Sequence, residues 1–150
     1  MTKSVESQIR SLKLEAVSYK KLENYSKAER CILKALDLKP GDNSLNHELA
    51  KIFFKNEKYH DCLELLLVLS DKIKRRQILF KDIAMCYYKM NQMEKSLEAV
   101  QHSLSENPDN ISSLYVEGLI QKELGNFQQS KSSFTKLLKL DSENRDALYQ

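Results

Sequence analysis

The sequence is poor in the residues that interrupt helices. Its 150 residues include three glycines, two prolines and no tryptophan. A chain with so few breakers is a poor match to folds built from many tight hairpins, and this composition favours helices. Leucine, lysine and glutamate, which are strong helix formers, are abundant. The composition therefore predicts a helical protein.

Long apolar segments and paired cysteines are also missing. The apolar run at 65–69 is far too short to cross a membrane, and the N-terminal segment lacks the apolar stretch of a secretory signal. Cys31, Cys62 and Cys86 form an odd set without a CxxC pair, so we interpret them as small buried residues in a reducing compartment. The expected location is cytoplasmic.

One segment recurs along the whole chain. "ENYSKAERCILKALDLKPGD" begins at Glu23, and altered copies begin at Glu57, Asn91 and Gly125, each 34 residues after the last. Four units fit without gaps, and a fifth begins at their end. Their ranges are 9–42, 43–76, 77–110 and 111–144, with 145–150 as the start of a further helix.

Each unit contains two apolar stripes that are spaced for helices. Spacings of three and four residues place each stripe on one helix face. The second stripe opens with Tyr25, Tyr59, Met93 or Phe127. Small residues that let two helices approach recur in one slot of the first helix and one of the second: Ala16, Ala50, Ala84 and Gly118, then Ala28, Cys62, Ser96 and Ser130. One such hairpin cannot bury both of its faces, so we expect the units to stack.

The unit boundaries carry their own signals. Pro40 and Pro108 stand where a second helix must end. A side chain of the Asp or Asn type at the entry to a first helix can cap its free backbone N–H groups. Such residues occur at Asp42, Asn110 and Asn144.

This pattern resembles the tetratricopeptide repeat family, whose 34-residue helix–turn–helix units carry small residues in these slots and a proline near their end. "KLENYSKAERCILKALDLKP" and "KELGNFQQSKSSFTKLLKLD" are close to the family consensus. Glu15, Asn46, Glu117 and Gln121 depart from it, and we expect looser packing around them. The resemblance implies an all-α fold, a right-handed superhelical solenoid that forms a single array over residues 1–150.

No chemistry is encoded in a recognisable motif. His47, His60 and His102 fall in three different repeat slots, and no histidine is placed to activate a cysteine. There is no glycine-rich phosphate loop, HExxH or GxSxG. We therefore expect no catalytic residue, no metal and no cofactor, and a protein that is not an enzyme.

In the family, the non-core face of the first helices lines a concave groove, and we call the matching residues here the first-helix face. Its predicted ligand-binding residues are Lys13, Val17, Lys20, His47, Lys51, Phe54, Lys55, Lys81, Met85, Tyr88, Lys89, Tyr115, Leu119 and Lys122. The face also includes Arg10, Leu14, Lys21, Ser44, Glu48, Ile78, Asp82, Ser112, Val116 and Glu123. It holds nine basic and three acidic side chains, although the whole chain has a net charge of only +3.

The leading hypothesis is a non-catalytic protein-interaction module whose basic, aromatic groove binds a peptide or protein segment with acidic and hydrophobic residues. The competing interpretation is that the lysines only keep the array soluble while Phe54 and Tyr88 pack against neighbouring units. A self-associating scaffold is a further alternative, because the chain ends inside a predicted first helix with Leu148 in a core slot. Low-specificity nucleic-acid binding ranks last, because lysine outnumbers arginine and no stacking platform is evident.

One family sub-type is disfavoured. Some members clamp the terminal carboxylate of heat-shock chaperones with a set of lysine, asparagine and arginine side chains. Only Lys13 fits that set among the matching positions of units one to three, which are Lys13, Val17, Glu48, Ile78 and Asp82.

Overall fold

The computed structural model describes residues 4–73 and 76–148, and the side chains of 4–73 and 78–146. This part of the chain forms eight helices and no strand, so the expected all-α repeat fold is confirmed. In chain order the helices are α1 (Val5–Lys21), α2 (Tyr25–Leu38), α3 (Asn43–Lys55), α4 (Tyr59–Lys72), α5 (Arg76–Lys89), α6 (Met93–Glu106), α7 (Ile111–Glu123) and α8 (Phe127–Leu148).

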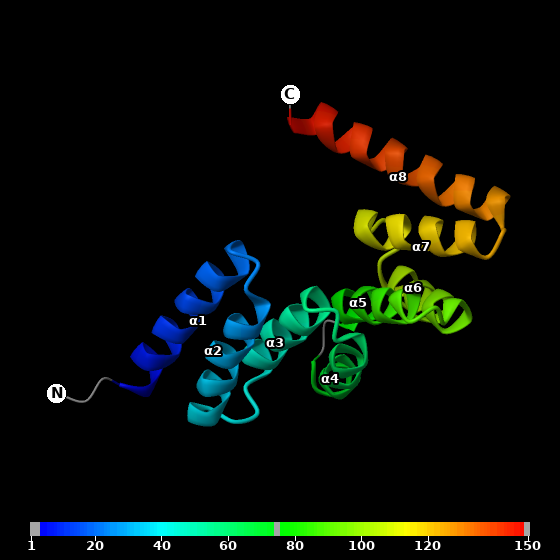
Figure 1. Ribbon diagram of the computed structural model, residues 1–150. Helices are drawn as coiled ribbons and strands as arrows, with labels where there is room; N and C mark the ends of the chain where they lie inside the picture. Colours follow the sequence, from blue (N-terminus) through cyan, green and yellow to red (C-terminus); the bar gives the residue numbers. More distant parts are fainter. Residues whose placement is uncertain (1–3, 74–75, 149–150) are drawn as a thin grey trace. The chain divides into compact units, whose positions relative to one another are not determined.

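The helices pair as consecutive hairpins within two compact units (Figure 1). Unit 1 spans residues 1–73 and contains α1 to α4; unit 2 spans 74–150 and contains α5 to α8. In unit 1, α2 also packs against α3. In unit 2, α7 packs against α5 and α6 as well as against its partner α8. Within each unit the later first helix therefore packs against the preceding hairpin, as stacked repeats require.

The predicted small slots are all buried and bring the helices of each hairpin together. Gly118 shows how tight this approach is, because a Cβ added there would lie 2.5 Å from the Phe134 ring. In unit 1, Ala16 and Ala28 belong to a core with Ile32 and Ile52, and Tyr25 packs against that core. The close helix contacts therefore depend on side-chain size at a few fixed positions.

The caps and stops at two predicted boundaries are confirmed. The Oδ1 atoms of Asp42 and Asn110 each accept a hydrogen bond of 2.9 Å from the backbone N–H three residues later. That backbone hydrogen bond, with help from Lys39, lowers the pKa of Asp42 although partial burial opposes the shift. Helices α2 and α6 end two residues before Pro40 and Pro108. Ser4 and Asn24 cap α1 and α2 in the same way, which the repeat pattern did not single out.

The fourth unit differs from the prediction at its end. Asn144 lies inside α8, which continues unbroken to Leu148 instead of giving way to a new helix at 145 (Figure 1). No glycine or proline occurs after Gly125, and Arg145 pairs with Asp141 at 2.8 Å across one helical turn. The prediction that Leu148 occupies a core slot lies outside the described side chains.

Phe127 is a second correction, because it is 69% exposed although it occupies a core slot. The equivalent Tyr25 packs against a cluster that includes Leu49 and Ile52 of the following first helix, α3. In the part of the chain that the structure describes, no first helix follows α8. A following first helix thus contributes to the cluster around Tyr25, and no such helix is described next to Phe127.

Candidate functional site

The predicted binding residues divide between the two units. The α1–α3 face carries Lys13, Val17, Lys20, His47, Glu48, Lys51, Phe54 and Lys55. The α5–α7 face carries Lys81, Asp82, Met85, Tyr88, Lys89, Tyr115, Leu119, Lys122 and Glu123. Each face is described by itself below.

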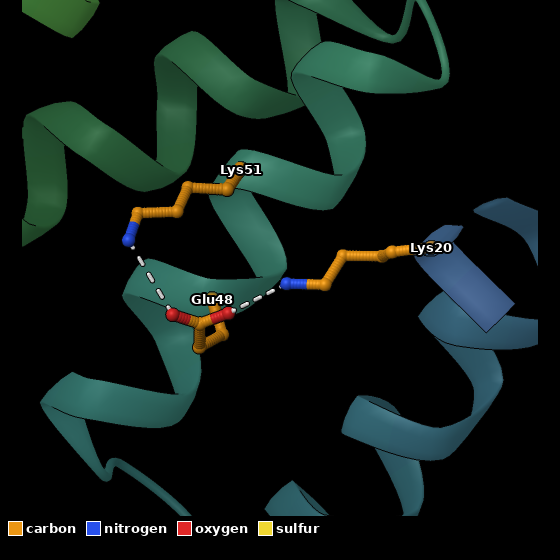
Figure 2. A network of polar contacts seen from close by, with 3 residues as sticks. All are labelled: Lys20, Glu48 and Lys51. Atoms are coloured by element: carbon orange, nitrogen blue, oxygen red, sulfur yellow. Dashed lines mark hydrogen bonds and ion pairs between the residues drawn. The ribbon is translucent and has the colours of Figure 1, made fainter. Parts of the chain in front are cut away.

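A carboxylate bridges two lysines on the α1–α3 face (Figure 2). Glu48 of α3 lies with Oε2 3.2 Å from the Lys20 Nζ of α1 and with Oε1 3.4 Å from the Lys51 Nζ of its own helix. Partial burial alone would raise the pKa of Glu48, but hydrogen bonds and charge interactions with Lys20 and Lys51 outweigh it and lower the pKa. The positive charge predicted here is therefore partly neutralised by the chain itself.

Two hollows lie along α1. One, with a volume of about 340 Å³, is lined by four residues of the first-helix face together with Glu6 and Ile9; the four are Arg10, Lys13, Leu14 and Val17. The other, of about 610 Å³, extends from Lys13 to Ser44 and Leu45 at the start of α3. Four of the six face residues of α1 thus line concave surface, with Leu14 64% and Val17 41% exposed.

Two aromatic side chains of the α1–α3 face are half-buried. The Phe54 ring meets the Tyr59 ring of α4 edge-on, with centroids 5.2 Å apart, and His47 lies on the same helix as Phe54. Phe54 therefore packs within its own repeat, whereas the competing interpretation of the sequence had placed it against neighbouring units.

The α5–α7 face is richer in aromatic and aliphatic groups. Tyr88 of α5 forms a hydrogen bond with the Glu123 carboxylate of α7; burial first, and then Glu123 and Tyr115, raise the pKa of Tyr88. Tyr115 is 52% exposed and meets the Phe134 ring edge-on at 6.0 Å. Half-buried Met85 and Leu119 lie on the same two helices, so this face presents aromatic and aliphatic groups among its charged side chains.

The remaining lysines differ in their partners. Lys81 lies 3.0 Å from the carboxylate of Asp82, its neighbour in the chain. Four others form no ion pair with a carboxylate of the described residues: Lys13, Lys55, Lys89 and Lys122. Together with Arg10 and Lys21 of α1, which also form no ion pair with a described carboxylate, these four can engage an acidic partner without breaking an existing pair.

One member of the first-helix face is misplaced by the sequence analysis. Val116 is only 4% exposed and belongs to the core. Its helix α7 packs against three other helices of unit 2, so more of the helix surface is buried than the repeat pattern predicts.

Glu15, Glu117 and Gln121, which depart from the family consensus, form hydrogen bonds within the fold. Glu117 accepts a hydrogen bond from the Ser133 hydroxyl at 2.6 Å, and Gln121 accepts one from Asn126 at 2.9 Å. Glu15 lies 3.6 Å from the Cys31 sulfur, and burial, followed by this carboxylate, raises the pKa of the Cys31 thiol.

Reactive groups do not gather in the described residues. Residues 4–73 and 76–148 contain no group of three or more His, Cys, Asp or Glu side chains that could hold a metal ion. The three cysteines are buried, and none of them forms a disulfide. Within the same ranges no helix has the length and apolar character needed to cross a bilayer.

The tetratricopeptide repeat model matches residues 3–42, 82–110 and 111–144, which is more than half of the chain. The chain belongs to the tetratricopeptide repeat family. Residues 43–81 lie outside the matched segments, although α3 and α4 form the same kind of hairpin there. Repeats of this family serve in protein–protein interaction, and their fold is typically non-catalytic.

Solved structures agree on the fold. MamA from Desulfovibrio magneticus RS-1 superposes with a TM-score of 0.80 over 90% of this chain and 76% of that one, at 19% identity. YrrB, described as a tetratricopeptide repeat protein with an unusual peptide-binding site, gives a TM-score of 0.72 over 89% of this chain and 69% of that one, at 17% identity. The fold is accordingly an α-helical repeat solenoid.

Curated relatives are longer proteins. Anaphase-promoting complex subunit 3 of Dictyostelium discoideum is 23% identical over 61% of this chain, and the human FK506-binding protein-like is 29% identical over 59%. The matched segments span 9% and 26% of those relatives' lengths.

Proposed function

We propose that the chain binds an extended or helical segment of a partner protein through its first-helix faces, and that this segment carries acidic and hydrophobic residues. One observation carries the proposal: on the first-helix faces, lysines without an ion-pair partner among the described residues lie among exposed apolar side chains, and two hollows lie along α1. Val17 at 41%, Ile78 at 51% and Tyr115 at 52% exposure supply apolar area that the fold does not bury.

The two components have different roles in this proposal. Aromatic and aliphatic groups on the α5–α7 face supply contact area, which dominates binding energy at protein interfaces. Lysines on both faces attract carboxylates, raise the association rate and make binding depend on salt. The ligand class follows from this combination and not from the identity of any relative.

A charge-reversal variant tests the electrostatic part. Lys51, Lys55 and Lys89 are changed together to Glu, and binding of a fluorescent synthetic peptide of alternating Glu-Leu and Asp-Phe pairs is measured by anisotropy. We expect a loss of affinity of about tenfold or more and a weaker dependence on salt, because three attractive contacts become repulsive. In the matched control, three exposed lysines on second helices are changed to Glu; they are Lys34, Lys131 and Lys139.

The result separates three cases. Equal loss in both triple variants would mean that net charge matters and the faces do not. Unchanged binding of the Lys51/Lys55/Lys89 variant would remove the proposed site. Binding of generic RNA by the wild type, abolished in the same variant, would replace the peptide with a polyanion.

Self-association is a second candidate, supported by apolar exposure on α8. Phe127 is 69% and Leu138 is 65% exposed. Sedimentation equilibrium of the wild type and of a Phe127→Ser/Leu138→Ser variant distinguishes the candidates. A monomeric wild type at high concentration contradicts self-association.

A further inference from the structure

The α1–α3 face already has a carboxylate where a ligand's carboxylate is expected. Lys20 comes from α1 and Lys51 from α3, and their ammonium groups meet the two oxygens of Glu48 at 3.2 and 3.4 Å. One oxygen faces each nitrogen, so the spacing of the two lysines suits a single carboxylate (Figure 2). The side chains of Lys20 and Glu48 are each 29% exposed, which leaves the group within reach of solvent.

The residue type at the position of Glu48 differs between the repeats. In the other repeats the slot of Glu48 holds Leu14, Asp82 or Val116. Asp82 contacts Lys81 of its own helix, and Val116 is buried. The ion pair between Glu48 and Lys20 joins two first helices, α3 and α1.

We propose that Glu48 is a built-in competitor, which holds the place between Lys20 and Lys51 that a carboxylate of the acidic partner takes on binding. The inference rests on the proposed function and adds a specificity-determining residue to it. When the partner binds, the Glu48 side chain turns out into solvent, and the partner's carboxylate accepts the hydrogen bonds that it leaves.

The exchange determines which partners are retained. Replacing one carboxylate with another at the same two lysines changes the number of ion pairs little. An isolated acidic side chain therefore gains almost nothing here. A partner is retained only when it also contacts apolar groups such as Val17 or the unpaired cations Lys13 and Lys55. Glu48 thereby selects against weakly acidic chains that lack hydrophobic residues.

The opposite role predicts the opposite result. If Glu48 served only to orient the two lysines for the ligand, its removal would loosen them and weaken binding. If Glu48 competes, its removal frees two cations and strengthens binding. Glu48→Gln decides between these roles, because it removes the charge and keeps the shape of the side chain.

The first arm uses acetate as the probe and needs no peptide. Acetate is titrated into the wild type and the Glu48→Gln variant while NMR follows the side-chain ε signals of Lys20 and Lys51. We expect half-maximal shifts at about threefold to tenfold lower acetate in the variant. Equal or higher acetate in the variant overturns the inference.

Glu29→Gln is the matched control. Glu29 of α2 forms an ion pair at 2.9 Å with Lys58, which precedes α4, also in unit 1. Its loss changes the net charge by the same amount. If it sensitises Lys20 and Lys51 to acetate equally, the effect is one of net charge and the inference is wrong.

The second arm measures the acidic, hydrophobic peptide described above at ionic strengths of about 0.01 and 0.1 M, where the Debye length is about 30 and 10 Å. We expect Glu48→Gln to bind about threefold to tenfold more tightly, with the larger gain at low salt. Equal or weaker binding than the wild type overturns the inference. If no variant binds the peptide while the acetate result holds, the proposed function fails and the assignment of Glu48 stands.

Discussion

The two units place different chemistry at equivalent positions of the same repeat. On the α1–α3 face three charged side chains are in contact: Lys20, Glu48 and Lys51. Two repeats later the same slots hold an aromatic and two aliphatic side chains: Tyr88, Val116 and Leu119. The hairpins form in both units because the small slots and apolar stripes carry the fold. The other positions of the first helices are thus free to carry ligand chemistry, and it varies along the chain.

The small slots of the two units also hold different residue types, although the side chain is small in each of them. In unit 2 the hydroxyls of Ser96 and Ser130 donate hydrogen bonds of 2.6 and 2.8 Å to the carbonyls of Ala84 and Gly118. In unit 1 the equivalent slots hold Ala28 and Cys62, and all of these residues are buried. A small side chain is therefore the requirement of the slot, and a hydrogen bond to the partner helix is optional.

The largest expected effect comes from giving Gly118 of unit 2 the alanine found at the equivalent position of unit 1, while its partner Phe134 is kept. Gly118→Ala places a Cβ 2.5 Å from Phe134, whereas the equivalent pair in unit 1 is Ala50 with Leu66. We expect the free energy of unfolding to fall by about 1–3 kcal/mol, reduced by the roughly 1 kcal/mol that Ala gains over Gly in a helix. Chemical denaturation measures it.

The double variant Gly118→Ala/Phe134→Leu is the control, since it recreates the unit 1 pair. It should recover most of the loss. A Gly118→Ala variant as stable as the wild type would show that the Phe134 ring moves aside freely, and that the two units do not differ in this contact.

A smaller effect is expected at the turns inside the hairpins. Glu23 and Glu57 of unit 1 have positive φ angles of 57° and 61°, and the equivalent residues of unit 2 are Asn91 and Gly125. Asn and Gly tolerate this left-handed conformation, whereas Glu is strained in it. Glu57→Gly should raise the free energy of unfolding by about 0.5–1 kcal/mol, and Gly125→Glu should lower it by a similar amount. Thermal or chemical denaturation of both variants measures the changes, and shifts of the same sign would contradict the strain argument.

The sequence predicted what local spacing controls. The 34-residue period located all four hairpins, and short-range signals located the caps at Asp42 and Asn110. The exposure of Phe127 was missed because a repeat slot does not show what covers it. The continuation of α8 was missed because the pattern placed a boundary at Asn144, where no glycine or proline ends the helix. Val116 was missed because the α5–α7 contact covers it.

The bridging role of Glu48 was missed for a different reason. The count of charges on the first-helix face included Glu48 only as one of three acidic residues beside nine cations. The bridge depends on the offset between two first helices, which places Lys20 opposite a residue 28 positions later in the chain. That offset is a usable signal in other arrays of this family, because lysine and glutamate at this spacing on adjacent first helices can meet. The ligand-binding role of the faces stays a prediction.

The smallest expected effect is a pH dependence that belongs to unit 1. The folded-state pKa of Glu48 lies below its ordinary value of 4.5, so between these two values the unfolded chain binds more protons and stability rises with pH. The contribution of Glu48 is complete above the unfolded pKa and is lost as the pH falls through the folded pKa. Because the group is partly exposed, we expect this contribution to stability to be less than about 1 kcal/mol.

Denaturation from neutral pH down to about pH 3 should show Glu48→Gln losing stability near neutrality and converging with the wild type in acid. In a Lys20→Gln/Lys51→Gln background the same substitution should no longer lower stability near neutrality, because the two cations that lower the pKa are gone and partial burial alone raises it. If the acid limb is as steep in Glu48→Gln as in the wild type, the bridge adds no pH-dependent stability to the α1–α3 face, and the contrast with the uncharged slots of unit 2 is one of surface chemistry alone.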